Sequence, residues 1–178
     1  MSTVMQVLPS MISGGVEVGT IEIARSLVQS GYNSVVLSSG GVLVPEVSKT
    51  STKHIKLDVK SKSPLNIILN IVKIADIIRE NKVDIVHARS RAPAWSCYYA
   101  ARKTNAHFIT TVHGIYSANN MFKRLYNSVM TKGDRVIAVS KFVRQYLLEN
   151  YIVNEENIRV IPRGVNHCLL YTSDAADE

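Results

Sequence analysis

Among the side chains that could do chemistry, one histidine stands directly after an apolar run and directly before a glycine. His113 follows residues 107–112, and Gly114 adds no side chain beside it. An imidazole in such a place can donate a hydrogen bond to a hydroxyl or a phosphate, or pass a proton near neutral pH. We therefore predict that His113 is a catalytic residue; a structural histidine at the end of a strand is the alternative.

Two adjacent glycines, Gly14 and Gly15, lie between a short apolar run and a segment with helical spacing. A loop that leads into a helix offers free backbone N–H groups and the positive end of the helix dipole to a phosphate. The spacing is G-G-x-x-x-G, and neither G-x-G-x-x-G nor G-x-x-x-x-G-K-[ST] occurs. A dinucleotide site and a P-loop are therefore disfavoured. We predict a phosphate contact at Gly14 and Gly15, with a plain turn as the alternative.

Two arginines, Arg89 and Arg91, follow another apolar run, and His87 comes just before them. Guanidinium groups bind phosphate or carboxylate in a forked manner that lysine cannot reproduce. We predict that Arg89, Arg91 and His87 bind an anionic ligand that carries a phosphate or a carboxylate. A solvated loop is the alternative for the arginines, and a place inside the strand is the alternative for His87.

Short apolar runs alternate with segments of helical spacing, an order typical of a doubly wound α/β fold with a parallel sheet. Seven strands are predicted, at residues 4–8, 33–37, 54–57, 83–87, 107–112, 135–139 and 158–161. Five helices are predicted between them, at residues 16–30, 64–81, 93–104, 119–132 and 141–150, two of which would start at a proline. Ligands of such sheets bind beyond the carboxyl ends of the strands. The glycines, the arginines and His113 all fall in loops at those ends.

Two of the predicted helices carry apolar stripes. The first comprises Ile67, Ile68, Ile71, Ile74, Ala75 and Ile78, at steps of three and four, and we expect it to face the core. The second comprises Met121, Phe122, Leu125, Tyr126 and Val129, beside the basic residues Lys123, Arg124 and Lys132. We expect this second stripe to pack on the sheet, with membrane or acceptor docking as the alternative.

The composition excludes several classes of protein. Residues 1–166 hold 21 basic and 11 acidic residues, which favours anionic partners but selects none. No helix shows the clustered basic and aromatic residues of a nucleic-acid reader, so we predict no nucleic-acid partner. Only Cys97 and Cys168 occur, so we expect neither a disulfide framework nor a metal site. With no secretory signal and no membrane span in sight, we expect a cytoplasmic location, with peripheral contact at an anionic membrane surface left open.

With these loops identified, residues 4–166 resemble the N-terminal half of a retaining GT-B glycosyltransferase of the family 4 type, similar to bacterial members that build lipopolysaccharide or other envelope glycans. The resemblance rests on GGVE at 14–17, DIVHARSRAPAW at 84–95, TVHG at 111–114, DRVIAVSKFV at 134–143 and IPRGVN at 161–166. It implies a Rossmann-like domain that forms one half of a GT-B fold, with the active site between two such halves.

The resemblance also implies roles for single residues. Gly14 and Gly15 would approach the donor diphosphate, and His113 would contact the donor sugar near the reacting centre. Ser140 would lie at the floor of the cleft on the donor side. The anionic ligand of Arg89, Arg91 and His87 would be the acceptor. Arg163 and Gly164 would belong to the donor side as well and open the hinge to a second domain; Arg163 stands where the family frequently has asparagine.

The C-terminal stretch changes character after Asn166. CLLYTSDAADE, at 168–178, resembles the conceptual translation of a sequencing adapter, so we expect residues 167–178 to be non-native and disordered. A genuine acidic tail is the alternative. The domain would then span residues 1–166, and the chain would stop at the hinge of the family.

These inferences predict the acceptor-side half of a glycosyltransferase. It would move a sugar from a nucleotide-diphosphate sugar to an envelope lipid or glycan acceptor with retention, without a metal or a cofactor, and would be inactive alone. A non-catalytic sugar- or anion-binding module of the same fold is the alternative.

Overall fold

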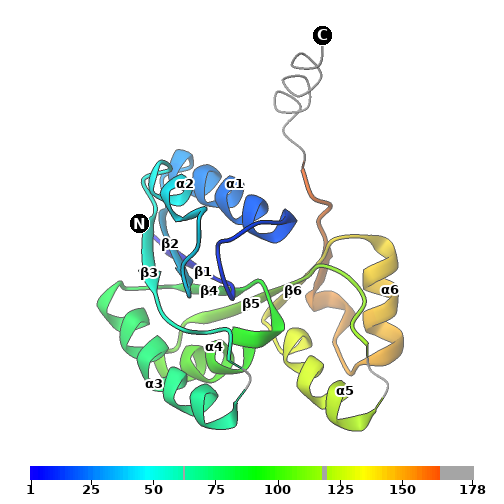
Figure 1. Ribbon diagram of the computed structural model, residues 1–178. Helices are drawn as coiled ribbons and strands as arrows, with labels where there is room; N and C mark the ends of the chain where they lie inside the picture. Colours follow the sequence, from blue (N-terminus) through cyan, green and yellow to red (C-terminus); the bar gives the residue numbers. More distant parts are fainter. Residues whose placement is uncertain (62, 118–119, 165–178) are drawn as a thin grey trace.

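The computed structural model describes residues 1–61, 63–117 and 120–164 and shows an α/β fold built on one parallel sheet (Figure 1). The strands are β1 (Thr3–Val7), β2 (Asn33–Ser38), β3 (Lys53–Lys56), β4 (Ile85–Ala88), β5 (His107–Val112), β6 (Arg135–Ala138) and β7 (Ile158–Val160). All seven were predicted, each within two residues at either end. The apolar runs form strands because both faces of a parallel sheet are covered by helices.

The strand order is β3-β2-β1-β4-β5-β6-β7, and every pair is parallel. The order of the strands therefore reverses between β1 and β4. In open α/β sheets, ligands bind where the order reverses, beyond the carboxyl ends of the strands. The loops after β1, β4, β5 and β6 meet at this edge of the sheet, which we call the crevice edge.

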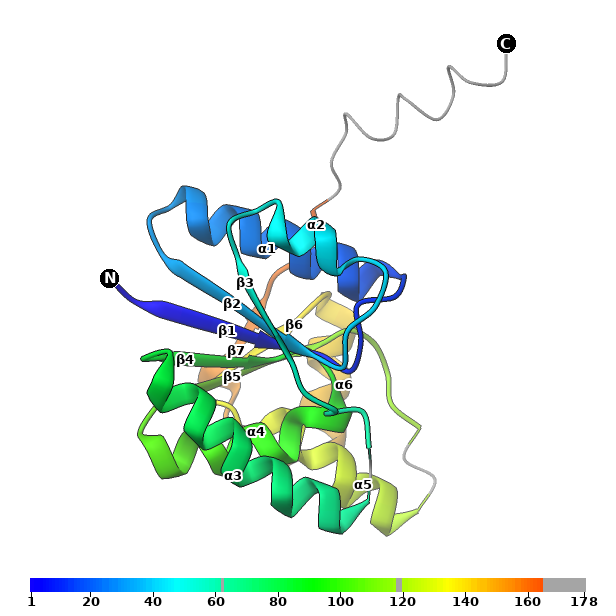
Figure 2. The same ribbon diagram turned by 60° about the vertical axis from the view of Figure 1, so that its left-hand side comes forward.

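Helices cover both faces of the sheet. The helices are α1 (Gly15–Gln29), α2 (Val44–Ser48), α3 (Pro64–Glu80), α4 (Arg91–Thr104), α5 (Met121–Asn127) and α6 (Lys141–Asn150), with 3-10 turns η1 (Ser128–Thr131) and η2 (Glu155–Asn157). In Figure 2, α1 and α2 lie on one side of the sheet, and α3, α4 and α5 lie on the other. The molecule is thus a three-layer sandwich, as the alternation of strands and helices predicts.

A separate apolar core lies on each side of the sheet. The larger core joins the strands to α3, α4 and α6, and includes Met5, Ile74 and Leu147, all almost fully buried. The smaller core lies under α1 and α2 and is formed by Leu8, Met11, Ile21, Val36 and Val47. The two cores hold the strands, and so the loops at the crevice edge, in fixed relative positions.

One helix that was expected to start at a proline and one short helix differ from the sequence predictions. The helix expected to begin at Pro93 begins at Arg91, after Ser90. Proline is tolerated in the first turn because its missing N–H would have no partner there. The helix expected at Pro64 does begin there. Helix α2 was not predicted, because five residues that follow a glycine pair give too short a pattern to detect.

The prediction that the apolar stripe on α3 faces the core was only partly correct. Ile74, Ala75 and Ile78 are buried as expected, whereas Ile68 is 60% exposed. Ile68 lies one step around the helix from the stripe through which α3 packs on α4, so neither the sheet nor α4 covers it.

The expected packing of the second stripe on the sheet was wrong for its first half. Met121, Phe122 and Leu125 are 82%, 83% and 63% exposed, whereas Val129 is fully buried. The helix ends after seven residues, and the following turn η1 makes the contact with the sheet instead, where Thr110 donates to the carbonyl of Met130 over 2.6 Å. Helix α5 therefore presents its apolar side chains outward.

Two further expectations concern the C-terminal tail and membrane-spanning helices. The predicted tail at residues 167–178 lies outside the described residues. Within the described part of the chain, no helix is both long and apolar enough to cross a membrane.

Candidate active site

The loops at the crevice edge bring four of the predicted site residues together. His113 follows β5 directly, and Arg89 follows β4 directly. Strand pairing aligns Ala88 with both Val7 and Thr110, so these loops leave the sheet at nearly the same level. Gly15 begins α1 just beyond β1, and Arg163 lies shortly after β7. The parallel register therefore places a histidine, two arginines and a helix N-terminus at one place.

His113 is held through one ring nitrogen and leaves the other without a partner. The Nη2 atom of Arg163 lies 2.8 Å from the Nδ1 atom of His113. The Nε2 atom is buried and has no hydrogen-bond partner among the described residues. The pKa of His113 is lowered to about 3, mainly by burial and in smaller part by the positive charges of Arg89 and Arg163. The imidazole is therefore neutral at physiological pH.

Arg89 is a buried cation, and only 4% of it is exposed. Its Nη1 donates to the Oε1 atom of Gln6 over 3.2 Å, and the amide of Gln6 donates in turn to the carbonyl of Thr20 over 3.0 Å. Burial lowers the pKa of Arg89 to about 10, Arg163 lowers it as well, and Glu17 opposes the shift. The guanidinium thus stays charged at neutral pH.

No carboxylate forms an ion pair with Arg89 within the described segments, and its Nε atom is buried without a partner. A buried charge without a counter-ion is costly, since desolvation is only partly offset by hydrogen bonds to neutral groups. An anionic ligand that approached Arg89 would remove part of this cost. The electrostatics of the site therefore favour an anion.

The two glycines at the start of α1 have different roles: Gly14 allows the turn, and Gly15 leaves room for Arg163. Gly14 has a φ of 125°, a conformation that favours glycine. A Cβ atom on Gly15 would overlap the Nη1 atom of Arg163. The guanidinium of Arg163 therefore lies over the first turn of α1, where free N–H groups also point.

His87 lies inside the sheet. It is 4% exposed, and its Nε2 atom lies 2.7 Å from the hydroxyl oxygen of Thr111 on β5. Burial lowers the pKa of His87 well below its usual value, and Arg89 and His113 add to this shift. A neutral, buried ring that joins β4 to β5 has a visible structural role, and its role in acceptor binding stays a prediction.

The guanidinium groups of Arg91 and Arg89 do not point at a common site for an anion. It begins α4, donates to the side-chain oxygen of Asn127 over 2.9 Å, and lies 4.2 Å from the centre of the Tyr116 ring. Burial raises the pKa of Tyr116 to about 12, and this tyrosine also hydrogen-bonds the backbone of His113. Arg91 therefore supports the loop that carries His113, and direct contact with an acceptor stays a prediction.

Ser140 and Gly164 occupy the remaining predicted positions. Ser140 caps α6, since its hydroxyl accepts from the backbone N–H of Val143 over 3.1 Å. Gly164 is exposed and ends the last described segment. The donor-side roles of both residues stay predictions.

Sequence reasoning missed Gln6 and Tyr116 as parts of the site. A glutamine inside the apolar run VMQVL is a detectable signal, because a buried amide needs partners. Tyr116 had no such signal, since its place under Arg91 depends on how the loop after β5 folds back. Among the described residues, no group of three His, Cys, Asp or Glu side chains could hold a metal ion.

Comparisons with known proteins identify the family and the fold. Residues 13–168 match the model of Glycosyltransferase Family 4. No curated protein sequence matches the chain. Among solved structures, a glycosyltransferase from Rickettsia africae ESF-5 is 51% identical over 99% of this chain, with a TM-score of 0.82.

Two more distant structures share the fold. Anabaena Alr3699/HepE, solved with UDP and glucose, is 14% identical over 93% of the chain, with a TM-score of 0.76. The lipopolysaccharide outer core galactosyltransferase WaaB, in its apo form, is 15% identical over 93% of the chain, with a TM-score of 0.70. The chain covers 46% of the Rickettsia structure, 45% of HepE and 46% of WaaB, so it spans about half the length of each. The fold is that of the N-terminal half of a GT-B enzyme, and the chain belongs to glycosyltransferase family 4.

Proposed function

We propose that this chain forms the acceptor-side half of a retaining glycosyltransferase that uses a nucleotide-diphosphate sugar and an envelope lipid or glycan acceptor. The observation that carries the proposal is the neutral His113, set between two guanidinium groups at the N-terminus of α1. A hydrogen-bond donor beside a site for anionic groups is the arrangement that a sugar diphosphate needs.

The donor diphosphate would bind against Gly14 and Gly15 and the Arg163 guanidinium. There the positive end of α1 and the Arg163 guanidinium would act on the same phosphate oxygens. The fold shared with HepE, which was solved with UDP and glucose, supports a nucleotide-sugar donor. Because Arg89 and Arg163 supply positive charge, we propose that transfer needs no metal ion.

The acceptor would meet the charge of Arg89. This residue is buried, lacks an ion-pair partner among the described residues, and lies in the loop between β4 and α4. The likeness of the fold to WaaB, a lipopolysaccharide galactosyltransferase, supports an envelope glycan or lipid as the acceptor class. A phosphate or a carboxylate on such an acceptor would neutralise the guanidinium.

Peripheral contact with an anionic membrane is part of the proposal. The exposed side chains of Met121, Phe122 and Leu125 on α5 are accompanied by Lys123 and Arg124. The chain has no Asp or Glu between Asp84 and Asp134, although it has seven Lys and Arg residues there. Apolar side chains flanked by cations suit a surface of anionic lipids.

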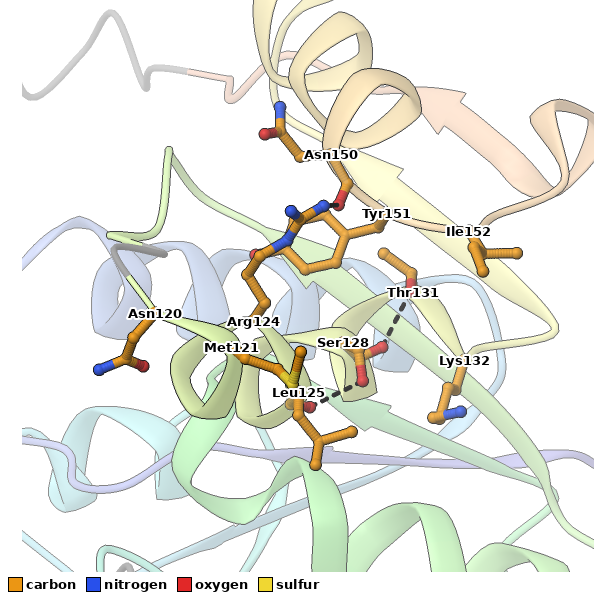
Figure 3. Close-up of a pocket in the computed structure, with 10 residues that line it drawn as sticks. All are labelled: Asn120, Met121, Arg124, Leu125, Ser128, Thr131, Lys132, Asn150, Tyr151 and Ile152. Carbon is orange, nitrogen blue, oxygen red and sulfur yellow. Dashed lines mark hydrogen bonds between the residues drawn. The ribbon is translucent and has the colours of Figure 1, made fainter.

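A groove beside α5 extends this surface. Figure 3 shows it between α5, η1 and the end of α6, with Arg124 directed toward Asn150. The groove measures about 680 Å³, and its lining includes Leu125, Lys132 and Ile152. Arg124 donates to the carbonyl of Asn150 over 2.7 Å. The surface thus pairs exposed apolar side chains with two cations, which suits a lipid headgroup and its first methylene groups.

Titration of this chain with donor sugars tests whether the active site is shared between two halves of a GT-B fold. Contacts worth about 4 kcal/mol from the other half of a GT-B fold would correspond to roughly a thousandfold in donor affinity. We expect millimolar or weaker affinity for UDP-sugars and GDP-sugars by calorimetry, and no turnover. Measurable transfer would show that this chain is a complete catalyst, and micromolar affinity without transfer would favour a sugar-binding module.

A further inference from the structure

The contact between Arg163 and His113 determines which ring nitrogen of His113 carries its proton. A guanidinium has only N–H donors and no acceptor. The Nη2 atom of Arg163, 2.8 Å from Nδ1, therefore donates, and Nδ1 accepts through its lone pair. A neutral imidazole that accepts at Nδ1 must carry its proton at Nε2.

We propose that Arg163 is a positioning residue that holds His113 as the Nε2–H tautomer, ready to donate to a hydroxyl of the bound sugar. The donation rests on the proposed function, whereas the tautomer does not. The Nε2 atom is buried and has no partner within the described segments. A buried N–H without an acceptor costs free energy, and a ligand hydroxyl would recover it.

Gly15 takes part in this arrangement. A Cβ atom there would overlap the Nη1 atom of Arg163, so the absence of a side chain lets the guanidinium lie over α1 and still reach His113. Arg163 thus connects the N-terminus of α1 to the histidine, across 148 positions of sequence. The same guanidinium can touch a phosphate on one side and orient the imidazole on the other.

The surrounding charges keep the ring in this state. Every described charged group that acts on His113, namely Arg89 and Arg163, is positive and disfavours a proton at Nδ1. His87, the other neighbouring titratable group, is held neutral by burial. His113 therefore serves as a hydrogen-bond donor and not as an acid that cycles through its cationic form.

Nitrogen-15 NMR of the imidazole rings in this chain tests the proposal without any substrate. We expect His113 to show the pattern of the Nε2–H tautomer, unchanged between pH 5 and pH 8. Arg163→Met removes the donor and should yield a mixture of tautomers, whereas Arg163→Lys, which keeps a cationic donor, should restore much of the original pattern. His107, at the opposite end of β5, is the internal reference and should not respond.

Gly15→Ala supplies a second test that leaves both partners intact. The new methyl group would meet only the end of a flexible arginine, so the chain should fold and the guanidinium should move away from His113. We expect the same mixed tautomer pattern as in Arg163→Met. An Nδ1–H tautomer in the unsubstituted chain, or spectra that neither variant changes, would overturn the proposal. If the predicted spectra appear but no sugar transfer is ever found, the proposed function fails and the positioning role stands.

Discussion

The guanidinium of Arg163 lies 2.8 Å from the imidazole of His113, although fifty positions of sequence separate the two residues. Arg163 lies shortly after β7 and His113 lies directly after β5, so a single hydrogen bond joins the segments that follow these two strands. Because Arg89 acts on both groups, the three side chains form one electrostatic unit.

His113 should be required for turnover. In an enzyme with both halves of the GT-B fold, His113→Ala should lower kcat by roughly 10² or more, because a donor to the transition state is lost. His113→Asn, which retains an N–H donor of similar reach, should lose less. Steady-state kinetics on both variants check this, and an unchanged kcat with an unchanged KM in His113→Ala would contradict it.

Arg89 and Arg91 should differ in their effects although they lie two positions apart. Inorganic phosphate, a probe for the anionic group of the acceptor, should raise the Tm of the chain, because a ligand that binds only the folded state stabilises it. Arg89→Met should remove the part of this rise that comes from the acceptor site. Arg91→Met should keep the rise but lower the free energy of unfolding by about 1 to 3 kcal/mol, since it loses contacts with Asn127 and Tyr116.

Thermal shift measurements with and without inorganic phosphate separate these outcomes. A phosphate effect that is unchanged in Arg89→Met, or that disappears in Arg91→Met, would contradict the assignment of the acceptor anion to Arg89.

Stability should fall in mild acid. The pKa values of His87 and His113 are lowered in the folded state, to about 3 for His113, so the unfolded chain binds protons first. The folded protein then loses stability as the pH falls below the ordinary histidine value of 6.5. At pH 5 the loss should be roughly 1 to 2 kcal/mol for each of the two histidines.

Urea unfolding at pH 7 and pH 5 measures this loss, and His113→Gln should remove about half of it. A free energy of unfolding that is the same at both pH values would contradict the burial of neutral histidines at the crevice edge.

Phe122 should contribute to membrane binding. Phe122→Ser should weaken binding to vesicles that contain anionic lipid by roughly tenfold, because an exposed aromatic side chain would no longer enter the interface. Val42→Ser is the matched control, since Val42 is 75% exposed but lies in the loop before α2. Co-sedimentation at several salt concentrations checks both variants. Equal losses in the two, or no preference for anionic over zwitterionic vesicles, would argue against this surface.

The sheet could be predicted from sequence because local patterns determine it. Each buried strand is an apolar run, and the alternation with helices leaves few topologies to consider. The exposed face of α5 could not be predicted in the same way. Its stripe has the spacing of a core helix, and only the early switch to η1, whose residues Val129 and Met130 fill the core instead, leaves Phe122 outside.

The candidate site also has features that the sequence could predict and features that it could not. His113, Gly15 and Arg89 were found because the carboxyl ends of parallel strands meet at one edge. The partners of the arginines depend on side-chain directions that spacing does not reveal, so Arg89 turned toward Gln6 and Arg91 toward Tyr116. The link between Arg163 and His113 joins segments too distant in sequence for any local pattern to show.

The central claim is that residues 1–164 form a working half of a sugar transferase. A chimera in which they are joined to the second half of the 51% identical Rickettsia africae glycosyltransferase tests it most directly. With a panel of nucleotide-diphosphate sugars and an envelope-lipid extract, we predict release of a nucleoside diphosphate matched by transfer of the sugar with retained anomeric configuration, unaffected by EDTA and lost in His113→Ala. A folded chimera that binds a donor but transfers no sugar to any acceptor or to water, or that transfers it equally well without His113, would contradict the account.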